Sequence, residues 1–441
     1  MPRTPLPPAV SGAKPVLGHA VEFVRDVDGL VARGHAEHGK IFSVTLPGKP
    51  AIYLLGPEHG KFLFAETDKR LTLRTAYPFF RHMFAPDNYF LAEYDEYLRQ
   101  REIILPRFQA RQLDGYVRLI QAEADRMIDG LGDHGEFNLT DTFDRLVLRS
   151  ISDCFLGPGT GDRLPGGLHK TFQAFAEAQD PFLPGWAPVP HMRRGRKARD
   201  QLRALVLGML EERRRRPADP PDFLQALVEA KYSDGAEVPD RIRMNLVLTL
   251  LHAGRETTAG HISWAIVDLL RHPDELDKVR AEIDEVAGPG EPLDTKLMHR
   301  LARMNRALLE SERMHPITPG LVRRAVEEME YAGYRIPKGS MVVSDPGRSH
   351  RLPDVYPEPD RYHPDRYLDD DKARHTLIGF GGGLHRCIGA RFAYLEIQVL
   401  LTRIFQRLEL ELVDLDPRPD PGFKVKWPEQ PCRVRYRKLT A

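Results

Sequence analysis

The spacing of apolar residues predicts helices over most of this chain. From about residue 57 to residue 312, apolar side chains recur with the helical period and are interrupted by proline- and glycine-rich loops. The longest predicted helix spans 240–270; it is strongly apolar at 246–251. Another helix is expected after the glycines at 381–383. The pattern therefore predicts a mainly α protein.

Alternating and strand-like stretches lie toward both ends of the chain. They occupy 41–46, 51–55, 323–334, 341–343 and 425–436, and an amphipathic stretch covers 20–38. The turn at Pro47–Lys49 predicts a hairpin between the first two. Because the strands come from distant segments, we expect small β-sheets within one domain over 1–441. Its β-rich lobe would come from N-terminal and late segments, and its helical lobe from about 60–310 and 375–405.

Composition narrows the class of protein. With 441 residues and a formal net charge of +1, the chain lacks the basic footprint of a nucleic-acid-binding protein. Its three cysteines have no paired spacing, which suits a reducing compartment. No apolar run reaches the roughly 18 residues of a membrane-spanning helix, and the N-terminus lacks the apolar core of a signal peptide. We expect a cytoplasmic protein with no transmembrane segment.

The sharpest candidate for chemistry is the segment 380–389, Phe-Gly-Gly-Gly-Leu-His-Arg-Cys-Ile-Gly. The start of a helix stabilises a thiolate at Cys387. If this thiolate ligates a metal held in a flat macrocycle, the glycines would let the backbone pass close to that ring, and Phe380 could shield the sulfur from solvent. The alternative is a glycine-rich turn with an incidental buried cysteine, which is the commoner case for such a loop taken alone.

This segment resembles the cysteine-ligand loop of the cytochrome P450 superfamily, F-x-x-G-x-x-x-C-x-G. The matching residues are Phe380, Gly383, Cys387 and Gly389. The resemblance implies haem b with Cys387 as axial ligand, Phe380, Gly381 and Gly389 beside the haem, and His385 as a propionate partner. It also implies the P450 fold, a triangular helical prism with the haem between the long central helix and the cysteine loop.

A second block, 253–258, lies within the long apolar helix. Gly254 lowers helix propensity by roughly 1 kcal/mol relative to alanine, and the hydroxyl of Thr257 can divert a backbone hydrogen bond. The alternative is a polar patch on an exposed face. The block resembles the family's oxygen-activating helix, and this resemblance makes Glu256 and Thr257 the acid–alcohol pair that delivers protons, with Ala253 beside the haem.

Glu310 and Arg313 have the i, i+3 spacing that, alone, indicates a surface ion pair. In this position they resemble the family's E-x-x-R helix, and Arg366 in 363–367 resembles the arginine that joins it. The resemblance implies a structural network that holds the cysteine loop.

Four more residues resemble haem-propionate contacts of the family or of its sterol-oxidising group. They are Tyr77, Tyr97, Arg101 and Arg323. Tryptophan is common where this chain has Tyr97. For each cation, the alternative is a solvated side chain.

Within the superfamily, the chain looks closest to the bacterial sterol 14α-demethylase group, through 76–80, Asp180-Pro181-Phe182 and 431–436. That group typically carries His-Thr-Ser or His-Thr-Thr where this chain has Glu256-Thr257-Thr258. The sequence therefore favours a monooxygenase acting on another bulky hydrophobic molecule: a terpenoid, a steroid or another secondary metabolite. Sterol 14α-demethylation is the alternative within the family. A haem-bound sensor without turnover and a peroxide-driven enzyme are alternatives of other classes.

The resemblance also implies a substrate pocket, dioxygen as co-substrate, and electron-transfer partners. Candidate pocket residues are Tyr77, Phe80, Phe84, Val247, Leu250, Ala253, Ile317, Leu321 and Phe423. No flavin- or nicotinamide-binding pattern occurs, so we expect electrons from a ferredoxin and a ferredoxin reductase in trans. Candidate docking cations for an acidic partner are Arg99, Arg107, Arg111 and Arg386. We expect a monomer.

Overall fold

A computed structural model describes residues 4–439, except Pro181, Pro220, Pro289 and 369–374, and only the backbone of Ala110 and Arg111. Pro181, part of a stretch quoted above, thus lies outside the described residues. The chain forms two compact units, each described below by itself. Unit 1 comprises 1–77, 305–387 and 417–430, and unit 2 comprises 78–304, 388–416 and 431–441. The expected single domain over 1–441 stays a prediction.

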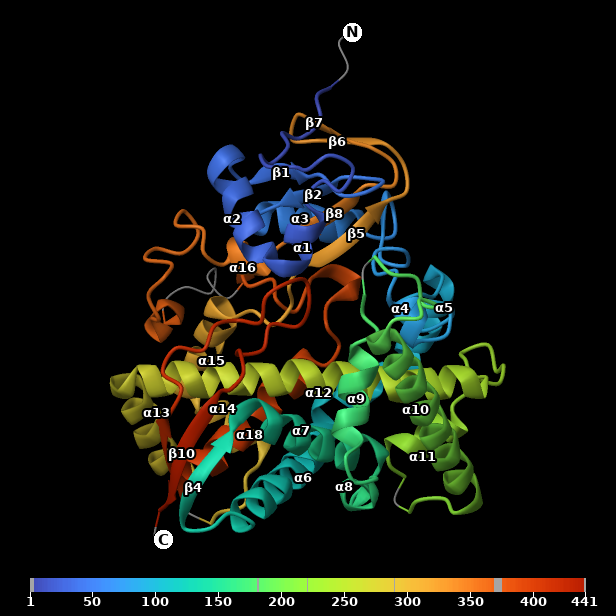
Figure 1. Ribbon diagram of the computed structural model, residues 1–441. Helices are drawn as coiled ribbons and strands as arrows, with labels where there is room; N and C mark the ends of the chain where they lie inside the picture. The colour runs from blue at the N-terminus through green and yellow to red at the C-terminus, as the bar shows by residue number, and fades with distance from the viewer. Residues whose placement is uncertain (1–3, 181, 220, 289, 369–374, 440–441) are drawn as a thin grey trace. The chain divides into compact units, whose positions relative to one another are not determined.

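Unit 1 is built on a five-stranded sheet of order β1-β2-β8-β5-β3 (Figure 1). Its strands are β1 (Ile41–Val44), β2 (Ala51–Leu54), β3 (Leu71–Thr72), β5 (Leu321–Ala325) and β8 (Met341–Ser344); β6 (Met329–Tyr331) and β7 (Tyr334–Ile336) form a separate pair. Antiparallel pairing of Ile41 with Leu54 confirms the predicted hairpin. Strand β2 also pairs with β8, in parallel, so distant segments meet in one sheet as expected.

Short helices accompany this sheet. They are α1 (Ala20–Arg25), α2 (Val27–His38), α3 (Pro57–Glu66), the later part of α15 (Ala302–Met314), α16 (Pro346–Ser349) and the 3₁₀ turns η2 (Pro364–Tyr367) and η3 (Gly383–His385). The predicted amphipathic stretch 20–38 divides at Asp26, whose side chain accepts the Gly29 N–H and caps α2.

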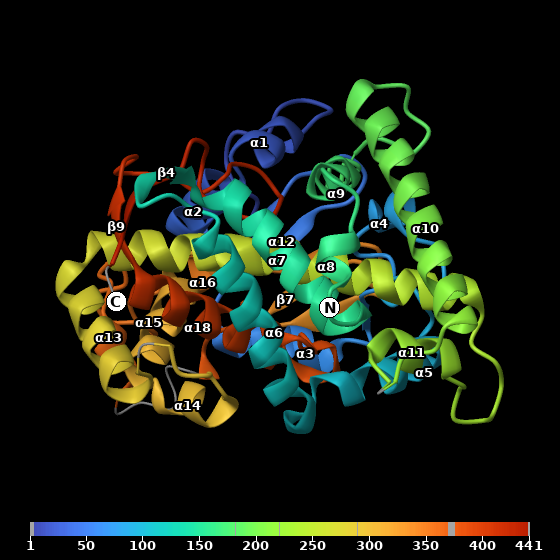
Figure 2. The same cartoon turned by 90° about the horizontal axis from the view of Figure 1, so that it is seen from below.

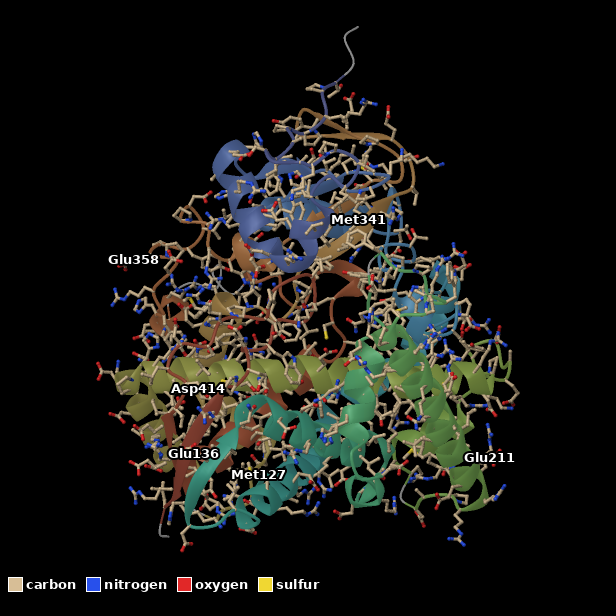
Figure 3. All side chains as sticks on the ribbon, viewed as in Figure 1. Met127, Glu136, Glu211, Met341, Glu358 and Asp414 are labelled. Atoms are coloured by element: carbon tan, nitrogen blue, oxygen red, sulfur yellow. The ribbon has the colours of Figure 1, made fainter. Side chains whose placement is uncertain are left out.

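Both faces of the sheet in unit 1 are covered by apolar side chains. Tyr53 belongs to one buried cluster, with Phe23 and Phe42, whereas Ile52 belongs to another, with Leu63. Successive residues of a strand point to opposite faces, so β2 is buried along its whole length. Met341, labelled in Figure 3, lies on the neighbouring strand β8 and packs at the edge of the first cluster. The sheet therefore lies in the apolar core of unit 1.

Unit 2 is mainly helical. It contains α4 (Phe80–Met83), α5 (Tyr94–Ile104), η1 (Leu105–Phe108), α6 (Ala110–Asp129), α7 (Leu139–Leu156), α8 (Thr160–Arg163), α9 (Leu168–Ala176), α10 (Pro190–Arg215), α11 (Phe223–Glu229), α12 (Asp240–Arg271), α13 (Pro273–Val286), α14 (Thr295–Arg300) and α18 (Ala390–Arg407). Helix α12 confirms the predicted long helix and packs along α7 (Figures 1 and 2). No helix of the described residues is long and apolar enough to cross a bilayer.

A three-stranded sheet of order β4-β10-β9 completes unit 2. Its strands are β4 (His134–Asn138), β9 (Leu408–Leu412) and β10 (Arg433–Lys438). Strand β4 lies within 57–312, where the helical period was predicted to dominate. Its partner is β10, with Phe137 opposite Val434, and a pairing so distant leaves no local signal. Arg435 of β10 pairs with Glu136 of β4 at 3.1 Å, and Glu136 is labelled in Figure 3.

Candidate functional site

The cysteine loop closes through backbone hydrogen bonds in unit 1. The Cys387 N–H donates to the Phe380 carbonyl at 2.9 Å, and the Gly381 N–H donates to the Ile378 carbonyl at 2.8 Å. Gly381 and Gly383 have φ of 71° and 63°. These values lie in the left-handed region that side chains disfavour, so the loop requires glycine at both positions.

The loop rests on the end of α3. A Cβ at Gly382 would lie 2.3 Å from the ring of Phe64, and one at Gly383 would lie 3.4 Å from the Phe64 carbonyl oxygen. Any side chain at Gly382 would displace an aromatic ring. The glycines therefore serve close packing within unit 1 as well as backbone conformation.

The three cysteines differ in access. Cys387 is exposed, whereas Cys154 and Cys432 are buried. Burial raises the pKa of the Cys154 thiol well above its usual value and raises the pKa of Cys432 to about 12. A buried neutral thiol is a poor metal ligand, so Cys387 is the cysteine placed to bind a metal centre. Helix α18 begins at Ala390, three residues later, with Gly389 before it.

Glu310, Arg313 and Arg366 form one buried network in unit 1. Arg313 donates to both carboxylate oxygens of Glu310 at 2.9 Å, and Arg366 Nε donates to the same oxygens at 3.0 Å. The side chains of Glu310 and Arg313 have no exposed area. The surface ion pair that spacing alone indicated is therefore replaced by a buried triad.

Hydrogen bonds connect this triad to the cysteine loop. Arg313 Nη1 donates to the His350 carbonyl at 3.0 Å, and the Ile378 N–H donates to His350 Nε2 at 3.0 Å. Burial, with nearby arginines, lowers the pKa of His350 to about 3, so its ring is neutral and can accept. Ile378 in turn accepts from Gly381 in the loop. The triad thereby fixes the residues that lead into the cysteine loop.

Two predicted propionate ligands of unit 1 meet at β5: Arg323 belongs to this strand, and the Tyr77 side chain is hydrogen-bonded to it. The Tyr77 hydroxyl accepts the Val322 N–H at 2.9 Å and donates to the Gly320 carbonyl at 3.3 Å. Arg323 donates from Nε to Thr67 Oγ1 at 2.9 Å. His385, the third candidate in unit 1, contacts Asp68 at 2.6 Å. Sequence reasoning singled out neither Thr67 nor Asp68.

In unit 2, the block 253–258 occupies the middle of α12. The Thr257 hydroxyl donates to the Ala253 carbonyl at 2.6 Å, which is the predicted diversion of a backbone acceptor. Glu256 and Thr257 are half-buried, while Arg255 and Thr258 are buried. The helix therefore presents the acid and the alcohol on a partly accessible face.

The buried Arg255 anchors this turn to α7. It is ion-paired with Asp144, whose other carboxylate oxygen accepts from Gln173 at 2.8 Å. Burial raises the pKa of Asp144 despite this partner. An arginine in so apolar a helix needs a buried carboxylate, and that requirement is the sequence signal that could have revealed the pair.

His252 lies one turn before Glu256. Its Nε2 is 3.6 Å from a Glu256 carboxylate oxygen and 3.0 Å from the Gln179 amide nitrogen. Burial and the nearby Arg255 lower the pKa of His252 to about 3. The ring is therefore neutral, so its contact with Glu256 involves a polar group without charge.

Arg101 on α5 provides a test of fit for a haem. Its Nε and Nη1 are buried and have no hydrogen-bond partner among the described residues. A buried guanidinium requires a counter-charge, which a propionate carboxylate would supply. One turn earlier, Tyr97 accepts a hydrogen bond from Tyr89 at 3.2 Å. Arg101 and Tyr97 therefore fit the propionates of a haem.

Comparison with known proteins decides the family. The family model described as cytochrome P450 matches residues 7–435. The chain belongs to the cytochrome P450 family. It is 31% identical to a sterol 14alpha-demethylase of Mycolicibacterium vanbaalenii, with 98% of each chain covered. It is 28% identical to a lanosterol 14-alpha demethylase of Rattus norvegicus, over 98% of this chain and 88% of the relative.

A solved structure of the retinoic acid-bound cyanobacterial CYP120A1 is also similar to this P450. Its TM-score is 0.90 at 25% identity, with 99% of this chain and 100% of that chain covered. These findings confirm the predicted superfamily and the mainly α fold with small β-sheets. The protein is a cytochrome P450 monooxygenase.

The candidate pocket residues of the P450 differ in exposure. In unit 2, Phe80 stacks on Phe90 at 5.0 Å and meets Phe84 edge-on at 5.8 Å. Leu250 and Ala253 are partly exposed, but Val247 is only 1% exposed and lies in the core of α12's packing. In unit 1, Leu321 is partly exposed and Ile317 is buried, while Phe423 stacks on Phe23 at 5.1 Å. Their contact with a substrate stays a prediction.

The candidate docking cations of the P450 differ in ion pairing and in exposure. Arg99 pairs with Asp234 at 2.9 Å and stacks over Tyr232 at 3.7 Å, so its charge is partly compensated. Arg99 and Arg107 line a cavity of about 210 Å³ between α5 and α11. Arg386 is exposed in unit 1, and the side chain of Arg111 lies outside the described residues.

A buried acid on α18 gives the P450 a testable pH dependence. Burial raises the pKa of Glu396 to about 8, and one of its oxygens accepts from Ser150 at 2.6 Å. The folded protein then keeps a proton that the unfolded chain loses above about pH 4.5, so this group makes stability fall as pH rises toward 8. We expect Glu396→Gln to gain stability relative to wild type across that window, by at most about 1.4 kcal/mol per pH unit. Urea unfolding at pH 5, 6.5 and 8 measures this; a difference independent of pH would contradict it.

Proposed function

We propose that this P450 inserts one oxygen atom of dioxygen into a C–H bond of a bulky hydrophobic molecule, a terpenoid, a steroid or another secondary metabolite. The observation that carries the proposal is the pairing of Thr257 and Glu256 on a partly accessible turn of α12, with the Thr257 hydroxyl bonded to the Ala253 carbonyl. A protein that only holds haem has no need of a proton-donating acid and alcohol in an apolar helix.

The cofactor proposed for this reaction is haem b, whose iron Cys387 would ligate. Haem supplies the dioxygen-activating redox chemistry, and thiolate ligation favours cleavage of the O–O bond. In unit 1, Arg323, His385 and Tyr77 would bind its propionates, and Phe380 and Gly381 would lie beside it. In unit 2, Arg101 and Tyr97 would bind its propionates, and Gly389 and Ala253 would lie beside it.

Thr257 and Glu256 are the residues that deliver protons in this proposal. The Thr257 hydroxyl donates to the Ala253 carbonyl, so its oxygen lone pairs accept a hydrogen bond from water. Glu256 is the nearby group that can exchange protons with solvent, because the neighbouring His252 is held neutral by burial. The pair thus moves protons inward from the accessible face of α12.

The substrate class is inferred from the lining residues and from the relatives. Aromatic and aliphatic side chains dominate the candidate pocket, as in most small-molecule sites. One similar structure is described as binding retinoic acid, and the similar curated proteins are named for demethylation of sterols. Both are extended or fused isoprenoid-derived molecules, which supports a bulky apolar substrate.

Sterol 14α-demethylation is the second candidate, favoured by the names of the relatives. Glu256 in place of the histidine typical of that group favours the first. A spectral titration of the purified haem protein with a sterol, a retinoid, a diterpene and a fatty acid discriminates between them. A spin-state shift with the sterol and its conversion to the 14-demethylated product would establish the second candidate, and a shift without demethylation would favour the first.

Electrons are proposed to come from a ferredoxin and its reductase as separate chains. Product formation from a bound ligand, with a surrogate ferredoxin and ferredoxin reductase, tests this proposal. If no product forms, the sensor alternative is favoured. Turnover with peroxide that survives Thr257→Ala would favour the peroxide-driven alternative.

Thr257→Ala should separate electron consumption from product formation. Without the hydroxyl, the water that delivers protons loses its acceptor at Thr257, and the product formed per electron consumed should fall about a hundredfold, at the low end for loss of a group acting in proton transfer. Thr257→Ser keeps the hydroxyl and should retain most coupling. The buried neighbour gives a matched control, Thr258→Ala, with coupling near wild type. Full coupling in Thr257→Ala would remove the proposed role.

A further inference from the structure

The turn that follows α3 contains Thr67 and Asp68, which contact two of the proposed propionate ligands. Thr67 Oγ1 accepts from Arg323, and Asp68 Oδ2 contacts His385. We propose that these two consecutive residues are positioning residues, which orient Arg323 and His385 for the haem propionates. The inference rests on the haem binding proposed above and adds to it two residues that orient the propionate ligands.

The contact between Asp68 and His385 defines the orientation of the imidazole. Asp68 Oδ2 and His385 Nε2 are 2.6 Å apart, and the side chains are 21% and 7% exposed. At this distance the carboxylate oxygen of Asp68 accepts a hydrogen bond from His385 Nε2. Charge-assisted bonds of this kind are short and strong. With Nε2 held at Asp68, the plane of the ring and the direction of Nδ1 are set, and Nδ1 is the ring nitrogen that would face a propionate.

Thr67 constrains the guanidinium of Arg323 in a similar way. The Thr67 hydroxyl donates its single proton to the Leu63 carbonyl at 2.7 Å and accepts from Arg323 Nε at 2.9 Å. Arg323 Nη1 donates to the Val322 carbonyl at 2.9 Å, and the residue is 4% exposed. Two fixed acceptors on one planar group set the direction in which its other N–H groups point.

The backbone of this turn explains how neighbouring side chains reach different partners. Thr67 is extended, with φ −62° and ψ 134°, whereas Asp68 has a left-handed φ of 67°. The Asp68 N–H donates to the Leu71 carbonyl at 2.7 Å, which stabilises the reversal. Non-glycine residues at positive φ are uncommon, and they concentrate at functional sites. Aspartate and asparagine tolerate this conformation best.

The same element supports the cysteine loop. Phe64, on the last turn of α3, packs against Gly382, as described above. The end of α3 therefore contacts the cysteine loop through Phe64, His385 through Asp68, and Arg323 through Thr67. One short segment sets the relative positions of the axial-ligand loop and two propionate ligands within unit 1.

A double-mutant cycle on the haem-loaded protein tests whether Asp68 acts through His385. The rate of haem transfer to excess apomyoglobin is measured for wild type, Asp68→Asn, His385→Gln and the double variant. Asparagine retains the left-handed backbone and the shape of the side chain while removing the charge. We expect Asp68→Asn to speed haem loss roughly tenfold, as for loss of one hydrogen bond to a charged group. The double variant should lose haem no faster than His385→Gln.

A spectroscopic readout separates positioning from general weakening of the fold. The propionate bending bands in resonance Raman spectra should shift in Asp68→Asn and in His385→Gln. The control Asp354→Asn removes a carboxylate of unit 1 that pairs with Lys40 at 2.7 Å, and it should change neither the bands nor the rate.

Several results would overturn the inference. An unchanged rate of haem loss in Asp68→Asn is one, and a tenfold effect that persists in the His385→Gln background is another. Should Asp68→Asn not yield haem-loaded protein, the cycle is run with Asp68→Gly, because glycine adopts φ 67° without strain. Wild-type protein that binds no haem would instead refute the proposed function itself.

Discussion

Cys387→His is expected to retain haem but lose the red-shifted absorption of the reduced carbonyl complex. Wild type should show that band, because it is peculiar to thiolate ligation. Histidine can ligate the iron but lacks the electron donation of a thiolate that favours O–O cleavage. Monooxygenase turnover should therefore fall at least about a thousandfold, at or beyond the upper range for loss of one electrostatic catalytic group.

The other cysteines provide controls for this experiment. Cys154→Ala and Cys432→Ala alter buried thiols whose pKa is raised by burial. Both variants should keep the carbonyl band at its wild-type position. A red-shifted band in Cys387→His, or its loss in Cys154→Ala with the fold intact, would contradict the assignment of the ligand.

Glu310→Gln is expected to destabilise the protein by about 3–5 kcal/mol, the typical cost of breaking a buried ion pair from one side. The change leaves the guanidinium groups of Arg313 and Arg366 without their shared carboxylate, although both side chains are nearly or fully buried. Since the triad is linked to the cysteine loop through His350, haem content should fall as well. Urea unfolding and the haem-to-protein ratio measure the two effects.

An exposed ion pair gives the matched control. Glu211, labelled in Figure 3, pairs with Arg215 across one turn of α10 at 3.4 Å, with 64% of the glutamate side chain exposed. Glu211→Gln should cost less than about 0.5 kcal/mol, as for surface pairs generally. Equal losses in the two variants, or a fully haem-loaded Glu310→Gln of wild-type stability, would remove the structural role of the triad.

Hydrophobic periodicity and turn residues predicted those helices and strands that depend on neighbouring residues in the sequence. The helix over 240–270 and the hairpin around Pro47–Lys49 follow from periodicity and turn chemistry, and α12 and the β1–β2 pair confirm them. Strand β4 was missed because five residues including Gly135 become a strand only through pairing with β10. Its partner is near the other end of the chain.

The residues of the candidate site also divide into those within short sequence motifs and those recognised only from their partners in the folded chain. Cys387 and Thr257 lie in short motifs, and the resemblance of these motifs to a known family could be recognised from the sequence. Glu310 and Arg313 look like a surface pair at i, i+3 spacing, and only burial in the folded chain distinguishes them. Asp68 gave no signal, because an isolated carboxylate in sequence does not reveal the cation that folding brings to it. For Asp144 the only signal was its partner Arg255, a cation in an apolar helix that needs a buried carboxylate.

The parallel pairing of β2 with β8 has a consequence for synthesis on the ribosome. Ala51 pairs with Met341, so the N-terminal hairpin has no β8 partner until roughly 290 further residues have been synthesised. This synthesis takes about 15–60 s at ordinary elongation rates. During that interval the edge of β2 offers unpaired backbone groups to any passing strand. Nascent chains should therefore engage chaperones early, and a chain that terminates before residue 341 should aggregate rather than leave a stable fragment.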